Sequence, residues 1–477
     1  MNKHSRSFRA SALALAVVGI LAAGQAGATG FQLRENSTKA LGRANAGSAV
    51  ARDDAAVVSN NPAAMSNFAT LTVQNDLTVI DLTAEFTGSA CTPVSPSVCV
   101  PIGGGNGGDP GSPTVVPAVA IVVPMKGALQ RLTLGASITA PFGLSTKYEP
   151  SWVGRYNATT SDVKVPALTV SAAFEITKTL SIGAGFIYQR ADVTLANGID
   201  FGRLLASAGI PGASIGNPVT DGSVSISGAD NGTGWVAGLQ FTPNEQFSIG
   251  YSHRSEIDHK IDGQADFSTP AAFAGAQPGF RNLAALYATL PANDPRRAAI
   301  PQLLVLGNGF ADTGGAAALT TPSIDTISAQ FNVSDTLRLY GDVQQTGWTS
   351  LKSVVVDFGN QFQPDSVEPF NWKDSMFYSV GAEFDISEAL ILRGGIAKDE
   401  SPTNDLDRSP RLPDDDRMLY SIGMSWGVNE HMTVDAAYQR ITIDDPTVNA
   451  LSSSGSRLTG SFDGNANLFA VGVNYKF

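Results

Sequence analysis

The sequence has little charge, little cysteine and no long apolar run outside its first residues. Only 16% of the 477 residues are charged although 43% are hydrophobic, whereas soluble domains carry roughly 25% charged residues. Downstream of Ala28, no stretch reaches the roughly 18 to 20 uninterrupted apolar residues that a membrane-spanning helix needs. The composition therefore argues against an ordinary soluble domain and against a helical membrane protein.

Several classes of function are also disfavoured. The net charge of −12 argues against a nucleic-acid partner, which requires a basic face. Of the four histidines, His253 and His259 share one predicted strand but lack a third ligand, so we expect no metal and no cofactor. The run Gly212–Gly216 fits G-x-S-x-G but lies in a Gly-rich loop and not in a strand–turn–helix setting. We therefore predict that the protein is not an enzyme.

The N-terminus has the three parts of a secretory signal peptide. Basic residues at Lys3, Arg6 and Arg9 precede an apolar run over 10–23, and small residues follow at 26–28. We predict a signal peptide over residues 1–28 and an exported mature chain. An uncleaved anchor is the alternative, but the apolar run is too short to cross a bilayer.

Both cysteines of the chain, Cys91 and Cys99, lie in a Pro/Ser/Gly-rich segment. In an exported protein, such spacing favours a short-loop disulfide. A metal site is the alternative, but no histidine or further cysteine lies nearby. We predict a structural disulfide on a loop.

Apolar residues alternate with small or polar ones along much of the chain. The last segment places Phe469, Val471, Val473, Tyr475 and Phe477 at every second position, and the pattern recurs over 132–138, 180–189, 376–386 and 418–426. A terminal Phe after such a strand resembles the end of bacterial outer-membrane barrels. Lipid cannot satisfy backbone groups, so a spanning sheet must close. A soluble sandwich would also alternate, but it would rarely place aromatic residues at both ends of so many strands. We predict an all-β transmembrane antiparallel barrel in the outer membrane of a Gram-negative bacterium.

Short and long connections alternate between the predicted strands. Tight polar turns occur near 126–127, 177–178, 243–245, 334–335, 387–388 and 429–430, and long links lie near 87–114, 141–162, 196–221, 267–320, 359–371, 400–415 and 444–457. This count predicts about fourteen strands over residues 69–477, with both termini on the periplasmic side.

Residues 29–68 show no strand pattern. Ser37 and Asp53 are candidate helix N-caps, and Pro62 should end a short helix. The segment is too apolar to lie free in the periplasm, so we predict a plug inside the barrel. A plugged barrel disfavours the alternative of a general porin.

The run GFQLRENSTKALGRANAGSAVARDDAAVVSNNPAAM (30–65) resembles the N-terminal hatch of the FadL-type family of outer-membrane long-chain fatty-acid transporters. The blocks at 142–158, 344–351, 371–381 and 411–417 resemble other parts of that family, in the same order. The resemblance implies a fourteen-stranded barrel that imports long-chain fatty acids or, in some members, aromatic hydrocarbons. We expect a monomer whose partners are hydrophobic small molecules and the surrounding lipid and lipopolysaccharide.

Two long loops carry apolar residues suited to a capture site. These residues are Phe201, Leu204, Leu205, Leu283, Leu286, Tyr287 and Leu290. Large exposed apolar surfaces usually mark binding sites. The alternative is that these side chains only pack the loops together; the family resemblance implies capture.

Residues Ala140, Pro141, Phe142 and Gly143 suggest an interrupted strand, because proline lacks a ladder donor and glycine marks bulges. The residues alone favour the alternative that the strand simply ends there. The resemblance implies an inward kink that opens the wall towards the membrane.

The resemblance also assigns a gate. Asn61, Pro62 and Ala63 resemble the family's NPA motif, and Gly30 and Phe31 resemble the N-terminal end that reaches the cargo pocket. The alternative is that Asn61–Ala63 only stops a helix.

Strand parity points several charged residues into the lumen: Arg131, Arg254, Glu256, Arg338, Asp342, Glu383, Arg393 and Asp435. Most should form ion pairs between wall and plug, because unpaired buried charge is unfavourable. Arg254 is our candidate for a contact with a cargo carboxylate. The Asp-rich 399–416 loop is expected to be a solvated, mobile surface.

Overall fold

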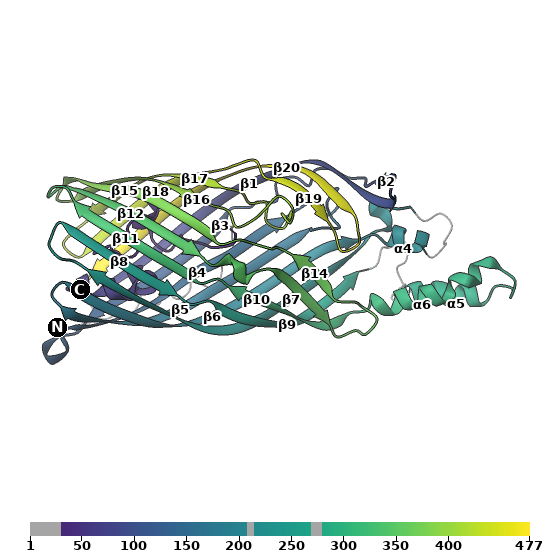
Figure 1. Cartoon of the computed structure of the whole chain (residues 1–477), viewed down its shortest axis with the longest axis horizontal. Helices are drawn as coiled ribbons and strands as arrows, with labels where there is room; N and C mark the ends of the chain where they lie inside the picture. Colours follow the sequence, from purple (N-terminus) through teal and green to yellow (C-terminus); the bar gives the residue numbers. More distant parts are fainter. Residues whose placement is uncertain (1–29, 208–213, 269–278) are drawn as a thin grey trace.

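The protein forms a closed antiparallel β-barrel. The computed structural model describes residues 30–207, 214–268 and 279–477, so the predicted signal peptide lies outside the described part. Within those residues, fourteen strands span the barrel. The first strand, β1 (Thr72–Ser95), closes the barrel by pairing with the last, β20 (Arg457–Lys476) (Figure 1). The predicted fold class is confirmed.

Some spans consist of two shorter strands separated by a break. In chain order the spans are β1, β3 (Thr114–Pro124), β4 (Leu132–Lys147), β5 (Thr160–Thr177), β6 (Leu180–Ile199), β7 (Gly222–Phe241), β8 with β9 (Phe247–Arg254, Ile257–Ser268), β10 with β11 (Thr313–Thr321, Ile324–Asn332), β12 with β13 (Leu337–Thr346, Ser353–Phe358), β14 with β15 (Ser366–Pro369, Ser375–Ser387), β16 (Leu390–Asp399), β17 (Arg417–Gly427), β18 (Met432–Ile443) and β20. Two further strands, β2 (Val98–Pro101) and β19 (Thr447–Leu451), lengthen hairpins at the long-loop end.

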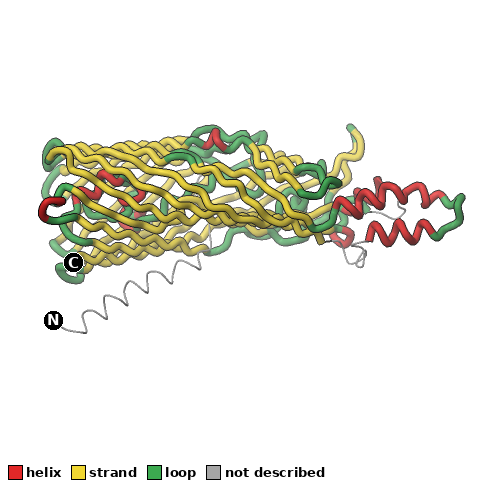
Figure 2. Tube along the Cα trace, turned by 90° about the horizontal axis from the view of Figure 1, so that it is seen from below, coloured by secondary structure: helices red, strands yellow, loops and turns green. Residues whose placement is uncertain are grey.

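The connections alternate in length along the barrel. The short turns lie at the end that carries the C-terminus, and the long loops lie at the opposite end (Figure 1). There, α5 (Gly279–Ala288) and α6 (Ile300–Gly309) form a helical hairpin that projects beyond the strands (Figures 1 and 2). The other helices outside the hatch in the described residues are short: α4 (Phe201–Ser207), η3 (Gly127–Leu129), η4 (Pro218–Thr220), η6 (Pro295–Ala299) and η7 (Trp348–Ser350).

The outer face of the wall is apolar and carries aromatic residues at two levels. Phe469 and Val471 on β20 are 55% and 57% exposed, whereas the intervening Ala470 is buried. Exposed aromatic side chains near the short turns include Phe174, Phe241, Phe331, Phe384, Trp426, Tyr475 and Phe477, and a second set, Tyr188, Trp235, Tyr378 and Tyr420, lies farther along the strands towards the long loops. Such girdles are typical of barrels in a bilayer.

Strand β1 extends further than the sequence predicts, because it continues to Ser95 and forms a hairpin with β2. Cys91 on β1 is disulfide-bonded to Cys99 on β2, with 5.5 Å between their Cα atoms. The bond therefore staples an extended hairpin and not an irregular loop.

The described part of the predicted plug, residues 30–68, is called the hatch here. It contains α2 (Thr38–Leu41), α3 (Val57–Asn60) and the 3₁₀ helix η2 (Pro62–Asn67). Ser37 caps α2 by accepting a hydrogen bond from Ala40 N. Asp53 does not cap α3, which begins after Ala56; its carboxylate instead pairs with Lys39 at 3.0 Å. Pro62 opens η2, so α3 ends at Asn60 before it.

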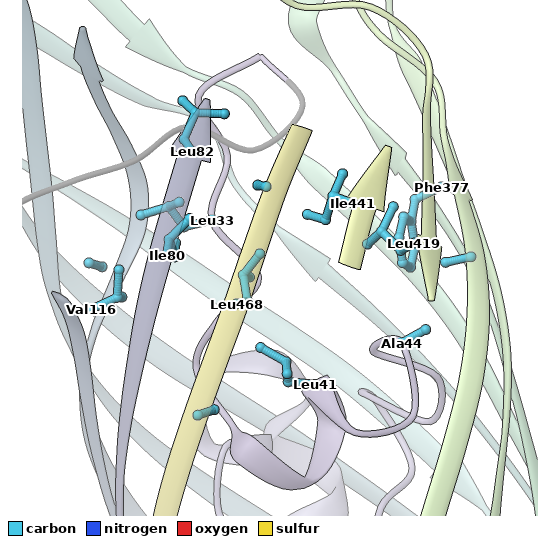
Figure 3. Close-up of a cluster of buried hydrophobic side chains, with 14 residues drawn as sticks. Leu33, Leu41, Ala44, Ile80, Leu82, Val116, Phe377, Leu419, Ile441 and Leu468 are labelled. Atoms are coloured by element: carbon cyan, nitrogen blue, oxygen red, sulfur yellow. The ribbon is translucent and has the colours of Figure 1, made fainter. Parts of the chain in front are cut away.

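The hatch packs against the inner face of the wall. Leu41 and Ala44 of the hatch contact a cluster that includes Ile80 on β1, Leu419 on β17 and Leu468 on β20 (Figure 3). In the described residues, no helix combines the length and apolar character needed to cross a membrane.

Two wall glycines show how closely the hatch approaches. A Cβ on Gly423 of β17 would lie 2.9 Å from the Cα of Gly42, and a Cβ on Gly395 of β16 would lie 2.3 Å from the backbone of Arg43. Side chains at these positions would occupy the space of the hatch backbone. The small residues in the alternating pattern therefore make room for the hatch.

Candidate transport route

A buried charge network holds the hatch to the wall. Glu383 on β15 forms ion pairs with Arg43 of the hatch, with Arg393 on β16 at 2.7 Å and with Arg338 on β12 at 3.0 Å. The Tyr340 hydroxyl donates to the same carboxylate at 2.9 Å. Glu383 thus pairs with one arginine of the hatch and two of the wall, and this network attaches the middle of the hatch to the wall.

Not every charged residue that strand parity places inside the barrel lies there. Arg131 is exposed at a turn, where its guanidinium stacks on the Phe174 ring at 5.0 Å. Glu256 is exposed because β8 ends at Arg254, and the break before β9 shifts the parity. These two inward assignments were wrong.

The NPA motif lies where the hatch meets the wall. Asn61 Oδ1 accepts a hydrogen bond from Ala63 N at 3.1 Å and so caps η2, which begins at Pro62. The amide nitrogen of Asn61 donates to Ala49 O in the hatch at 2.7 Å and to Leu239 O on β7 at 3.1 Å. The motif is thus more than a helix stop, because its side chain bridges two hatch segments and the wall.

Strand β4 is interrupted at the predicted place but does not end there. Its register with β5 shifts between Thr139 and Phe142, and the strand then continues to Lys147. The alternative that the strand stops at Pro141 was wrong, because the ladder with β5 resumes at Phe142↔Val165.

The other edge of β4 loses its neighbour at the same place. In the described chain, β3 pairs with β4 only from Pro124↔Thr133 to Val119↔Ile138. On its other edge β3 pairs with β1 from Thr114 to Val122, so only the edge that faces β4 is unpaired before Val119. The hatch supplies the missing partner: Leu33 N donates to Pro141 O at 2.8 Å and Gly143 N donates to Phe31 O at 2.7 Å. Hatch backbone, and not β3, therefore covers the wall edge at this break.

An apolar cavity lies on the long-loop side of Phe31. It measures about 100 Å³, and its lining includes Phe31, Leu144, Val163, Ile261, Leu319 and Trp372. The Phe31 ring contacts Trp348 with centroids 4.9 Å apart and Phe142 at 5.8 Å. Phe31 therefore links the cavity lining to the interrupted part of β4.

Gly30 positions Phe31. Its φ of +58° is in the left-handed region, and an added Cβ would lie 2.7 Å from the Trp348 ring. A side chain here would be strained and would displace Trp348.

The 399–416 loop folds into the barrel mouth and is not the solvated surface predicted. Asp414 is buried and accepts a hydrogen bond from Gly30 N at 2.9 Å. Burial raises the pKa of the Asp414 carboxyl, while Arg417 opposes that rise. Arg411 reaches the cavity lining, where Glu368 neutralises it at 2.8 Å. Composition alone suggested a solvated loop because it could not show that arginines partner these aspartates.

Most of the loop residues predicted for capture are packed together. Phe201 and Leu205 of α4 and Tyr287 of α5 are buried in one cluster, and Leu204, Leu283 and Leu290 are partly buried against it. Leu286 is different, because it is 58% exposed on α5. Leu304 and Val305 on α6 are exposed as well. The helical hairpin thus combines packed apolar residues with exposed apolar residues on both of its helices.

Arg254 is buried and lines a second, polar cavity on the other side of Phe31 and Leu33. That cavity also touches Ala140 and Pro141. Among residues 30–207, 214–268 and 279–477, no group of three or more His, Cys, Asp or Glu is arranged to hold a metal ion. The segment Gly212–Gly216 lies partly outside the described residues.

These features define a class: an outer-membrane β-barrel whose lumen is filled by an N-terminal hatch and whose wall is interrupted beside it. The family model described as outer membrane protein transport protein (OMPP1/FadL/TodX) matches residues 19–477. The chain belongs to this family of outer-membrane transport proteins.

Relatives match over their whole length. A long-chain fatty acid transport protein of Escherichia coli O6:H1 is 27% identical, with 98% of this chain and 99% of the relative covered. Outer membrane protein P1 of Haemophilus influenzae is also 27% identical, with 99% and 100% covered.

Solved structures share the fold. A Pseudomonas aeruginosa FadL homologue matches with a TM-score of 0.79 at 23% identity, covering 94% of this chain and 100% of that one. The Pseudomonas putida toluene transporter TodX matches with a TM-score of 0.63 at 14% identity, with coverage of 94% and 100%.

Proposed function

We propose that this barrel takes up long-chain fatty acids by passive diffusion and releases them sideways into the membrane. The observation that carries the proposal is the contact of Phe31 with both the apolar cavity and the interrupted part of β4. A molecule that displaces Phe31 would leave the cavity next to the only wall edge that the hatch covers among the described strands.

The first step is capture at the long-loop end. Leu286, Leu304 and Val305 offer apolar surface on a helical hairpin that extends away from the barrel. Surfaces of this kind attract apolar molecules from water. The packed residues of the same loops, Phe201 and Tyr287 among them, support the hairpin.

The second step is transfer into the apolar cavity. Phe31 forms part of its lining and is followed by Gln32, whose side chain bonds Gln344 at 3.0 Å and Thr346 at 2.9 Å. A few hydrogen bonds and ring contacts thus hold this short stretch, whereas the charge network around Glu383 fixes the rest of the hatch. We infer that Gly30–Leu33 moves and that the body of the hatch stays in place.

The third step is exit beside Ala140–Gly143. The backbone groups of Pro141 and Gly143 bond the hatch and not β3. Movement of Gly30–Leu33 would free this edge and open the wall towards the lipid. The wall can open here without breaking a strand-to-strand ladder.

Aromatic hydrocarbons are the second candidate cargo. The apolar cavity of about 100 Å³ is close in size to a dry protein cavity of roughly 150 Å³ that binds benzene. A general porin is disfavoured because the hatch residues Arg43, Leu41 and Met65 are fully buried against the wall.

Uptake by cells lacking their own transporter of this type tests the proposal. We expect the gene to confer uptake of radiolabelled palmitate, and mass spectrometry of the purified barrel to detect co-purifying fatty acid. Uptake of toluene with no uptake of palmitate would favour the second candidate. Large steady ion currents in a planar bilayer would support a porin instead.

A further inference from the structure

The second, polar cavity lies between the hatch and strands β4, β8, β11 and β12. It measures about 80 Å³. Its polar lining includes the hatch residues Asn36, Asn45, Ser48 and Asn60 and the wall residues Arg254, Thr326 and Gln344. Its apolar lining includes Leu33, Ala140 and Pro141, so the cavity reaches the interrupted part of β4.

Two of the charged residues that line this cavity have their partners in the protein. Arg34 bonds Asp399 at 2.7 Å, Gln344 at 3.1 Å and Gln32 at 3.3 Å. Asp342 accepts hydrogen bonds from the backbone of Gly47 and Ser48 at 2.6 and 3.0 Å. Neither charge needs a further ligand.

Arg254 differs from both. It is only 8% exposed, and its Nε and Nη2 atoms are buried without a hydrogen-bond partner among the described residues. Two residues of the cavity lining lie beside Arg254 in the wall: Ser252 on the same strand, β8, and Ile324, which is paired with Arg254 on β11. Neither residue carries a charge. A buried guanidinium without a counter-charge is strongly unfavourable, so a site of this kind favours a bound anion.

We propose that Arg254 holds the carboxylate of a fatty acid that has passed Phe31, with the tail directed along Leu33 and Pro141 towards the wall opening. The inference rests on the proposed uptake function and assigns its head-group site. A cavity of about 80 Å³ admits a head group and a few methylene groups but not a whole chain. The tail must therefore extend out of the cavity, and the apolar lining residues Leu33, Ala140 and Pro141 lie next to the exit.

The polar cavity also explains how one barrel could treat acids and hydrocarbons differently. A hydrocarbon has no group to pair with Arg254, whose Nε and Nη2 atoms would stay without a hydrogen-bond partner. The apolar cavity accepts either cargo, while the polar cavity favours an anion over a neutral molecule.

The test compares palmitate with methyl palmitate, which lacks the charge. Purified wild-type barrel and the Arg254→Gln variant are equilibrated with an equal mixture of the two, and the retained molecules are quantified by mass spectrometry. We expect the wild type to retain more palmitate than methyl palmitate. In Arg254→Gln the ratio of retained palmitate to methyl palmitate should be about tenfold lower than in the wild type. Arg190→Gln, which removes an exposed guanidinium from the outer face of β6, should keep the wild-type ratio.

The outcomes separate this inference from the proposed function. Retention of both molecules with the same ratio in wild type and Arg254→Gln would overturn the anion site and leave uptake intact. Retention of neither molecule by the wild type would overturn both. Arg254→Lys keeps the charge, and a preference restored by this variant, in a barrel that migrates as folded on unheated gels, would rule out a merely structural role for Arg254.

Discussion

Leu33 donates its backbone N–H to the carbonyl oxygen of Pro141, 2.8 Å away, at the place where β4 parts from β3. A residue of the hatch thus occupies a ladder position that a neighbouring strand would fill in a regular barrel. An isolated antiparallel bridge between Gln32 and Phe142 likewise pairs a hatch residue with β4. The edge of the wall and the end of the hatch are therefore one hydrogen-bonded unit, and moving one exposes the other.

Deleting Pro141 should close the exit. Between Thr139↔Ala167 and Phe142↔Val165, β4 has one residue more than β5. Removing that residue would restore a continuous register and take away the carbonyl group that Leu33 uses. We expect loss of palmitate uptake with normal amounts of folded barrel in the outer membrane.

Pro141→Ala is the control for this deletion, because it keeps the extra residue and its carbonyl group. Uptake should stay near the wild-type level. Full uptake by the deletion variant would argue against exit beside Ala140–Gly143.

Glu383→Ala should loosen the hatch. It leaves Arg43 and Arg393 buried without their shared acid, and removing one partner of a buried pair costs about 3–5 kcal/mol. We expect a lower temperature for loss of the folded band on gels and larger ion currents in planar bilayers. Glu85→Gln, at an exposed position on β1, should change neither. Wild-type currents and stability in Glu383→Ala would show that the network is not what fixes the hatch.

Gly395→Ala should disturb the hatch from the wall side. The new methyl group would lie 2.3 Å from the backbone of Arg43, so either β16 or the hatch must shift. Overpacking of this kind costs about 1–3 kcal/mol. Its neighbour gives a matched control: at Gly394 the methyl group would come no closer than 3.8 Å to Ser421 O. We expect urea unfolding in detergent to be shifted in Gly395→Ala and unchanged in Gly394→Ala.

The sequence predicted the barrel well because alternation is a local property. The pattern from Phe469 to Phe477 needs no knowledge of its neighbours, and the short turns follow from composition. The hatch was predictable as a non-strand segment, but its contacts were not. Nothing near Gly395 in the sequence indicates that Arg43 lies against it.

The site was predictable only in part, for the same reason. Pro141 predicted a break in β4, because a proline cannot donate a backbone hydrogen bond to a neighbouring strand wherever it occurs. Trp348 and Asp414 gave no such signal, since their importance comes from contacts with Gly30, more than 300 positions away in the chain. The buried arginines of the 399–416 loop likewise become apparent only when Glu368 is brought beside Arg411.

Polar substitutions on the helical hairpin should weaken capture and leave release unchanged. Leu286 on α5 and Val305 on α6 are 58% and 51% exposed, so replacing both with Asn removes apolar surface without opening a cavity in the loops. At low palmitate concentration, uptake should fall several-fold, because fewer molecules reach the cavity. At saturating concentration, the rate should return to the wild-type value, because Phe31 and the break at Pro141 are untouched.

Replacing the packed residue Leu205 with Asn provides the contrast, since Leu205 is 2% exposed. In that variant the cluster that packs α4 against the helical hairpin should be disrupted. The loops should then be cleaved faster in limited proteolysis than those of the wild type. A Leu286→Asn/Val305→Asn barrel that matches the wild type at low palmitate would show that cargo enters without using the exposed apolar residues of the hairpin. Capture would then have to begin at the barrel mouth, where Leu412 of the 399–416 loop lines the apolar cavity.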